Sequence, residues 1–303
     1  MTRTKTFFFI ITLCMVITAC FYYVEFAEKK AFQSKEAMGI THNLHAYYLL
    51  MHRNERDYFS EHDTAFLENH QNYVKKIKHE LNKIKEIPVL TSDVLQATTA
   101  IEIGLQTYLN TFNQLVQLQI SAGINPNHGD YGLLRKAAHQ IEHILAKQNQ
   151  EIILNQLLNL RRVEKDFMLN PSQQQREAFK DLFQQFDKQT AHLNASPQSA
   201  ATFQQAKQSY HTYFHQYAEK ILYMGLSDTD GLFGDLYKEA MLLERQVERI
   251  LQDFTELSKK TEKKAHVEAK VLSILFPVFI LILTFFLFII LFYKQSNEST
   301  ATP

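Results

Sequence analysis

Glycine is almost absent from this chain except at six positions, which form two triplets with the same internal spacing. The first triplet is Gly123, Gly129 and Gly132, and the second is Gly225, Gly231 and Gly234. The 303 residues contain eight glycines in all, and a glycine inside a helix costs about 1 kcal/mol relative to alanine. Scarce glycine is therefore typical of long helices. The repeated triplet predicts two copies of one helical unit, each followed by the same tight connection.

Other landmarks repeat in the same order. The segment from Arg53 to Tyr58 (RNERDY) matches the segment from Arg162 to Phe167 (RVEKDF), 109 positions later, and Pro88 and Pro197 are also 109 apart. The glycine triplets are 102 apart, so the two spacings differ by seven residues. Seven residues are one heptad, and removing a heptad leaves the apolar face of a helix pointing the same way. We interpret the chain as an internal duplication; the alternative is a coincidence of spacing.

Two uncharged stretches lie near the ends of the chain. The first, 7–24, has 18 residues and the second, 271–293, has 23. About 20 apolar residues cross a bilayer as a helix. These stretches predict two transmembrane helices, preceded by a cytoplasmic N-terminus (1–6) and followed by a short cytoplasmic tail (294–303). We expect both spans to lie in a bacterial inner membrane, in contact with lipid.

The first stretch has a second interpretation. Ile17-Thr18-Ala19-Cys20 resembles a bacterial lipobox, in which cleavage would leave Cys20 as a lipidated N-terminus. The apolar run continues past Cys20 into Phe21 and two tyrosines, which favours an uncleaved span with an aromatic interface belt. Both cysteines, Cys14 and Cys20, fall in this stretch. The 246 residues between the spans therefore form no disulfide, thiol nucleophile or cysteine metal site.

The lysines near the spans leave the orientation of the middle domain open. Eight of them flank the spans on the side of the middle domain: Lys29, Lys30, Lys35, Lys259, Lys260, Lys263, Lys264 and Lys270. A simple positive-inside count would place that domain in the cytoplasm. The rule weakens for loops longer than about 60 residues, so we expect a periplasmic middle domain and keep the cytoplasmic one as an alternative.

The region between the spans has helical periodicity and no useful strand-like alternation. We expect helices over about 25–60, 64–86, 92–122, 131–169, 172–193, 199–224 and from 232 into the second span. In the last helix Leu243, Val247, Ile250, Phe254 and Leu257 form a coiled-coil-like seam. The predicted fold is all-α, with two stacked four-helix-bundle modules (25–130 and 131–270) related by the repeat and flanked by the two transmembrane helices.

Two segments resemble a known family. Arg161 to Leu169 (RRVEKDFML) is similar to the Arg-x-Glu-Lys-Asp-Phe-Leu motif of helical extracytoplasmic sensors in bacterial chemoreceptors and sensor kinases. The segment after Gly123 resembles the loop and helix of the same sensors, through Asn125-Pro126, Gly129, Tyr131-Gly132, Leu134-Arg135, His139 and Glu142. Two such modules between two spans resemble the helical bimodular sensor domain, over roughly 25–270.

The resemblance implies a function and partners. It implies a periplasmic domain that binds small organic anions (carboxylates), works as a homodimer, and signals through the second transmembrane helix, as in chemotaxis receptors. Members continue after that helix into a linker and a kinase or methyl-accepting output, whereas this sequence ends at Pro303. We therefore expect a separate signalling partner; a split gene or a truncated remnant are the alternatives.

Arginine is the residue most suited to hold such an anion, because its planar guanidinium binds a carboxylate with two parallel hydrogen bonds. The candidate ligand-binding residues are Arg53, Arg56, Arg161, Arg162 and Arg135. The structural alternative is that Arg53 and Arg162 only form i,i+4 ion pairs with Asp57 and Asp166, which stabilise a helix by about 0.3–0.5 kcal/mol each. Tyr237 replaces Arg135 in the second copy, so the modules should not bind the same ligand equally.

The aromatic and histidine patterns indicate structural roles and no ligand site. The spacing of Phe112, Phe179, Phe183, Phe186, Phe203, Tyr213, Phe214 and Tyr217 is typical of a core. Histidine pairs at helical spacing, His42/His45, His139/His143 and His211/His215, could chelate a metal, but the Glu-x-x-His motif of di-iron bundles is missing and we expect no metal or cofactor.

The sequence also argues against some classes of function. It has no phosphate-binding loop, nucleophile elbow or zinc-protease motif, so we expect no enzyme. The net charge of zero gives no sign of nucleic-acid binding. The alternative to a sensor is a non-catalytic helical scaffold or interaction protein of the inner membrane.

Overall fold

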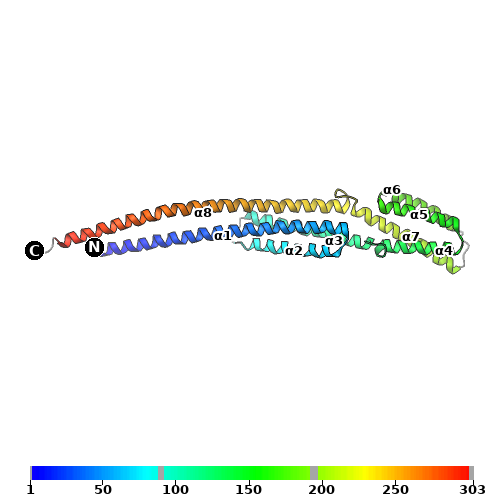
Figure 1. The fold of residues 1–303 in the computed structure, drawn as a ribbon, viewed down its shortest axis with the longest axis horizontal. Coiled ribbons are helices and arrows are strands. Elements are labelled where there is room, and N and C mark those ends of the chain that lie inside the picture. The colour runs from blue at the N-terminus through cyan, green and yellow to red at the C-terminus, as the bar shows by residue number, and fades with distance from the viewer. Residues whose placement is uncertain (1, 88–91, 192–196, 300–303) are drawn as a thin grey trace. The chain divides into compact units, whose positions relative to one another are not determined.

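The computed structural model describes residues 2–87, 92–191 and 197–299, and all regular elements in these ranges are α-helices (Figure 1). The all-α prediction is thus confirmed for the described residues. The helices are α1 (Thr2–Glu61), α2 (Thr64–Lys85), α3 (Ser92–Ala122), α4 (Gly129–Lys147), α5 (Glu151–Leu169), α6 (Gln173–Thr190), α7 (Pro197–Met224) and α8 (Gly231–Ser299). Pro88, one of the landmarks of the proposed repeat, lies outside the described residues.

Short polar side chains set several helix ends. Before α2, Asp63 accepts a hydrogen bond from the backbone N–H of Ala65 over 2.9 Å, and His62 adopts a left-handed conformation with φ of 58°. Before α6, the Ser172 hydroxyl accepts from the backbone N–H of Gln175 over 3.2 Å. These oxygens satisfy backbone donors that have no partner within the helix. The turns fall at the predicted positions.

The predicted single helix over 131–169 is wrong, because the chain reverses between α4 and α5. Asn149 adopts the left-handed conformation with φ of 51°. Its N–H donates to the Ala146 carbonyl (3.2 Å), and the Gln150 N–H donates to the Leu145 carbonyl (3.0 Å). This is a Schellman motif, with asparagine in the place that glycine usually takes. Asparagine tolerates this conformation, so the break carries no glycine or proline for a sequence reading to find.

The chain divides into two compact units that do not follow sequence order. Unit 1 comprises 1–51, 69–99 and 246–303, and unit 2 comprises 52–68 and 100–245. The boundary predicted between the modules 25–130 and 131–270 divides the chain in sequence order instead, and it stays a prediction. In unit 1, apolar side chains of α1, α2 and α8 are buried, among them Leu44, Leu81 and Ile250 at 0% exposure. Four of the five predicted seam residues of α8 are buried: Leu243, Val247, Ile250 and Phe254.

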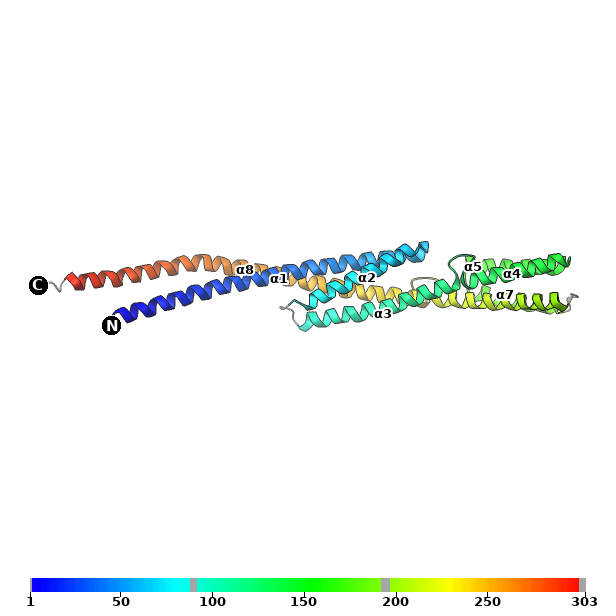
Figure 2. The same cartoon turned by 90° about the horizontal axis from the view of Figure 1, so that it is seen from below.

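Within unit 2, helices α4 to α7 contact one another in a closed ring: α4 packs on α5 and α7, and α6 packs on α5 and α7. Figures 1 and 2 both show α4 and α7 side by side. An aromatic-rich core fills the ring, including Phe167, Phe179, Phe186, Phe203 and Phe214. Of the eight aromatic residues predicted as core, six are buried, and Tyr213 and Tyr217 are partly buried against the same core.

The two glycine loops adopt matching conformations, as the repeat predicts. Gly123 and Gly225 begin them with φ of 110° and 92°. A side-chain carbon would lie 2.2 Å from the His128 carbonyl oxygen at the first position and 2.0 Å from the Asp230 carbonyl oxygen at the second. In the first turn of the helix that follows each loop, the N–H of the third glycine donates to that same carbonyl over 2.9 Å. Only glycine permits such a close backbone approach with positive φ.

Helix α8 is continuous over 69 residues with Pro277 inside it. Among the described residues, one helix is long and apolar enough to cross a membrane: the candidate covers Gly231–Phe286, and its most apolar window has a mean hydropathy of 2.4. The apolar part coincides with the start of the predicted second span and supports membrane association. The first span, 7–24, and the periplasmic placement of the middle domain stay predictions.

Candidate functional site

A buried carboxylate lies at the centre of the α4–α7 ring. The Glu164 side chain, on α5, has 0% exposure. One of its oxygens accepts hydrogen bonds from the Tyr210 hydroxyl of α7 (2.8 Å) and from the Arg161 guanidinium (3.3 Å). The other oxygen lies 3.1 Å from the Lys165 ammonium. A carboxylate taken out of water is tolerated when positive charge and hydrogen-bond donors surround it, and Glu164 has both.

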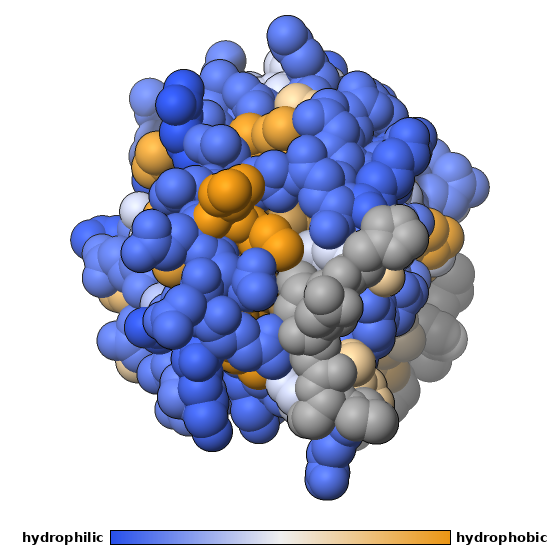
Figure 3. Space-filling view, turned by 90° about the vertical axis from the view of Figure 1, so that its right-hand side faces the viewer, coloured by the Kyte–Doolittle hydropathy of each residue, from blue (hydrophilic) through white to orange (hydrophobic). Residues whose placement is uncertain are grey.

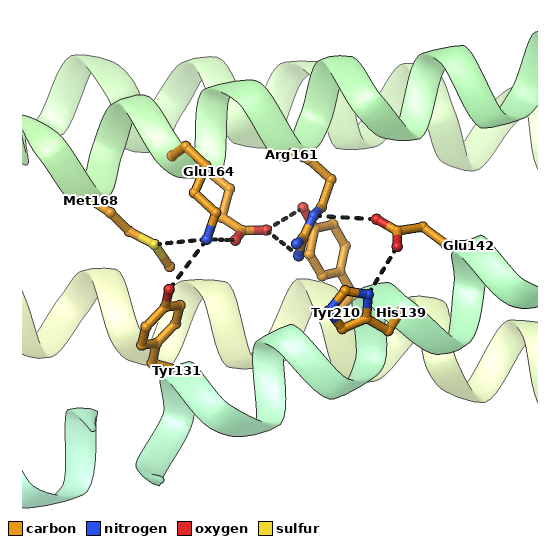
Figure 4. Close-up of polar contacts among 8 residues, drawn as sticks. Tyr131, His139, Glu142, Arg161, Glu164, Met168 and Tyr210 are labelled. Atoms are coloured by element: carbon orange, nitrogen blue, oxygen red, sulfur yellow. Dashed lines mark hydrogen bonds and ion pairs between the residues drawn. The ribbon is translucent and has the colours of Figure 1, made fainter. Parts of the chain in front are cut away.

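The polar contacts continue outward from Glu164 to the surface (Figure 4). The Arg161 Nε lies 3.5 Å from a carboxylate oxygen of Glu142 on α4, and the other oxygen of Glu142 lies 2.9 Å from His139 Nδ1. On the other side, the Lys165 ammonium donates to the Tyr131 hydroxyl over 3.4 Å and lies 5.1 Å from the centre of that ring. The network therefore joins α4, α5 and α7.

Exposure increases from one end of this network to the other. The side chain of Arg161 is 16% exposed, that of Glu142 is 28% exposed and that of His139 is 54% exposed. Burial and the negative charge of Glu164 raise the pKa of Tyr210 well above its ordinary value of 10.0. Tyr210 thus stays a neutral donor to Glu164, and the carboxylate that solvent can reach is Glu142.

The segment that we interpret as the first copy contains a matching buried glutamate. Glu55, 109 residues before Glu164, accepts from the Tyr108 hydroxyl over 2.5 Å. Tyr108 is 102 residues before Tyr210, which is the spacing of the glycine triplets. Where the second copy has Arg161, the first has His52, whose Nδ1 lies 3.2 Å from Glu55. That hydrogen bond raises the pKa of His52, with burial acting in the opposite direction.

The five predicted ligand-binding arginines occupy different environments. Arg161 alone among them is drawn into the interior, with its guanidinium between Glu142 and Glu164. Arg53 is 70% exposed and lies 3.5 Å from Asp57, the predicted i,i+4 pair. Arg56, Arg135 and Arg162 are exposed, and Arg135 donates to the Asn127 side chain over 3.5 Å. No ion pair joins Arg162 to Asp166 within the described residues. The role of the five arginines in ligand binding stays a prediction.

In the described part of the chain, no group of three or more His, Cys, Asp or Glu side chains comes together at the histidine pairs or elsewhere. The Nε2 atoms of His211 and His215 on α7 are 3.0 Å apart, and the His211 ring lies 4.4 Å from that of Phe183. Burial, followed by the nearby charges of His211, Arg176 and Lys180, lowers the pKa of His215 to about 4. We interpret this pair as a neutral, partly buried contact.

Sequence reasoning missed Glu142, Glu164 and Tyr210 as members of the site. Glu164 stands inside the motif Arg161–Leu169, beside the arginines that the anion-binding argument favours. A signal for the pair was present: Glu164 and Tyr210 each recur in the first copy, at the two spacings of the repeat. The spacings of 109 and 102 residues, applied to the polar residues of the helices, lead to this pair of glutamate and tyrosine.

No model of a known protein family matches the chain, and a search of curated proteins finds no match to it. The resemblance to the helical bimodular sensors therefore remains an interpretation of the quoted residues.

Proposed function

We propose that this protein is a membrane-anchored sensor that binds a small organic acid at Arg161 and passes a conformational signal along α8 to a partner. In this proposal it is built of two stacked bundle modules, is held by two spans in a bacterial inner membrane, and carries its middle domain in the periplasm. The observation that supports it is the environment of Arg161. Its largely buried guanidinium faces one buried carboxylate and one that solvent reaches.

The binding step is an exchange of carboxylates. The contact between Arg161 and Glu142 is long, at 3.5 Å, and the Glu142 side chain is 28% exposed. A ligand carboxylate can take the place of Glu142 on the guanidinium, while Glu142 keeps its contact with His139 and turns to water. Glu164 stays in place and holds Arg161, because its other partners, Tyr210 and Lys165, are unaffected. A bidentate contact with the ligand would replace a single long one.

The exchange changes which helices are tied together. Glu142 belongs to α4 and Arg161 to α5, so losing their contact releases α4 from α5 at this level. A loop of six residues, 225–230, joins α7 to α8. A change in the packing of α4, α5 and α7 would reach α8 through that connection, and a continuous helix can carry a small shift or rotation into its apolar segment. The ligand changes the conformation only by binding one arrangement more tightly.

Calorimetric titration of the full chain in detergent with acetate, succinate, citrate and benzoate tests the binding step. We expect heat with at least one acid, and at least about tenfold weaker binding for Arg161→Gln, since a charge-assisted hydrogen bond contributes about 1.5–3 kcal/mol. Arg162→Gln is the matched control, because it removes the same charge from the exposed neighbouring position and should change the affinity less than about twofold.

A second variant gives a result of opposite sign. Glu142→Gln removes the carboxylate that competes for Arg161, so the affinity for the acid should rise by about three- to tenfold. Far-UV circular dichroism checks that each variant is folded. Silence from all four acids, or equal losses in Arg161→Gln and Arg162→Gln, would refute the assignment of the site.

A scaffold that binds another protein is the second candidate, and exposed apolar side chains on α5 favour it. Ile152, Leu158 and Leu169 are 78%, 50% and 84% exposed. Figure 3, which views the right-hand side of Figure 1, shows a mostly hydrophilic surface with small, separate groups of apolar residues. Isolated apolar residues are normal on protein surfaces. A mass measurement in detergent distinguishes a homodimer from a complex with another membrane protein.

A further inference from the structure

We propose that unit 1 carries a binding site for the phosphate of an anionic phospholipid headgroup, between α1 and α8 where their apolar stretches end. The inference is separate from the acid site, and it rests on the membrane anchoring in the proposed function. The site is a cavity of about 260 Å³, with walls that include Tyr23, Phe26 and Lys30 of α1 and Lys260, Lys264 and Glu268 of α8.

The polarity of the cavity walls follows the polarity of a lipid. On α1, Tyr23 and Phe26 stand at the end of the uncharged stretch, and Lys30 follows one turn later. On α8, Lys264 precedes the apolar stretch at Val271 by seven residues, or about 10 Å along a helix. Phe26 is 61% exposed and Tyr23 is 46% exposed. Aromatic rings next to an apolar span favour the boundary between acyl chains and headgroups. The lysines, one turn or more beyond the rings, would then lie at the depth of the headgroup phosphates.

The charges of the walls favour an anion. Three lysines and one glutamate line the cavity. The Lys264 ammonium lies 3.7 Å from Glu268, and that of Lys260 lies 2.7 Å from Glu256, with the lysine side chains 76% and 73% exposed. Ion pairs this exposed contribute little, so a phosphate can compete for both ammonium groups. Within the described residues, Lys30 makes no ion pair.

The neighbouring lysines of α8 provide a matched control. Lys260 and Lys264 line the cavity, whereas Lys259 and Lys263, one position earlier in each case, do not. Replacing either pair by glutamine removes two positive charges from the same two turns of the same helix. Only the first replacement removes them from the cavity, so the comparison separates a built site from general attraction to a charged surface.

The test measures which lipids the purified full chain retains. The chain in detergent is incubated with equal amounts of phosphatidylglycerol and phosphatidylcholine, and retained lipid is counted by native mass spectrometry. We expect preferential retention of phosphatidylglycerol. Lys260→Gln/Lys264→Gln should lower that preference by at least about fivefold, the effect of roughly one lysine at an anionic membrane surface. Lys259→Gln/Lys263→Gln should leave it within about twofold.

Three results would overturn the inference. Equal losses in the two double variants would show general surface charge in place of a site. An equal count of the two lipids in the wild-type chain would show no selection of the headgroup. Displacement of phosphatidylglycerol by millimolar inorganic phosphate would assign the cavity to soluble anions. A chain that stays soluble without detergent would refute the anchoring itself, and that outcome is read independently of the lipid count.

Discussion

Replacing the buried Glu164 by alanine should destabilise unit 2 strongly. The Tyr210 hydroxyl is buried and would lose its acceptor at 2.8 Å, which costs about 1–3 kcal/mol for an unsatisfied buried donor. The Arg161 guanidinium, 16% exposed, would keep only its long contact with Glu142. Lys165, 43% exposed, would be hydrated and add little. In total, the free energy of unfolding should fall by about 3–5 kcal/mol, as expected when one partner of a buried ion pair is removed.

Thermal unfolding of the full chain in detergent, followed by far-UV circular dichroism, measures this loss. For a unit of this size, each kcal/mol lowers the melting temperature by about 2–4 °C, so Glu164→Ala should lower it by about 6–20 °C. Hydrogen exchange in α5 and α7 should rise together with that change, because the lost contacts join these helices.

The matched control is Glu177→Ala on α6. Glu177 is 48% exposed and pairs with Lys180 at 3.2 Å, so its removal should cost less than about 0.5 kcal/mol. Glu164→Gln should fall between the two, since an amide oxygen still accepts from Tyr210 but carries no charge for Arg161. A loss below about 1 kcal/mol for Glu164→Ala would refute the view that this carboxylate holds the ring together.

Predictions for three further variants follow from the structure. The lowered pKa of His215, about 4 against an ordinary 6.5, means that the unfolded chain takes up a proton that the folded chain does not, so stability is lost as the pH falls from 6.5 towards 4. After allowance for solvent screening, the loss of folding stability is about 1–2 kcal/mol. The difference in melting temperature between wild type and His215→Gln should therefore narrow or reverse between pH 6.5 and 4. A difference that stays constant over this range would contradict the prediction. Gly225→Ala should cost at least about 2 kcal/mol, because the methyl group would lie 2.0 Å from a carbonyl oxygen at a φ of 92°. Gly39→Ala in α1, with no atom within 4 Å of the new carbon, should instead stabilise by about 0.5–1 kcal/mol; urea unfolding of both variants tests the contrast.

The sequence predicted most of the helices because its signals are local. Scarce glycine, helical periodicity and turn residues at 60–63, 123–130 and 225–231 act within a few residues, and the described helices begin and end near these positions. The reversal at Asn149 was missed for the same reason. Nothing in Gln148-Asn149-Gln150 forbids a helix, and the hairpin forms because α4 and α5 bury apolar faces against α6 and α7.

The interpretation as a duplication rests on spacing, since two sets of landmarks keep their distances and each glycine triplet makes its own close backbone approach. The role of each charged residue was decided only in three dimensions. Arg161 and Arg162 are neighbours with the same side chain, yet one faces Glu142 and Glu164 and the other faces solvent. Which of them enters the interior depends on the direction of each side chain around α5 and on the glutamate that α4 presents. Packing sets both, and packing joins residues far apart in the chain.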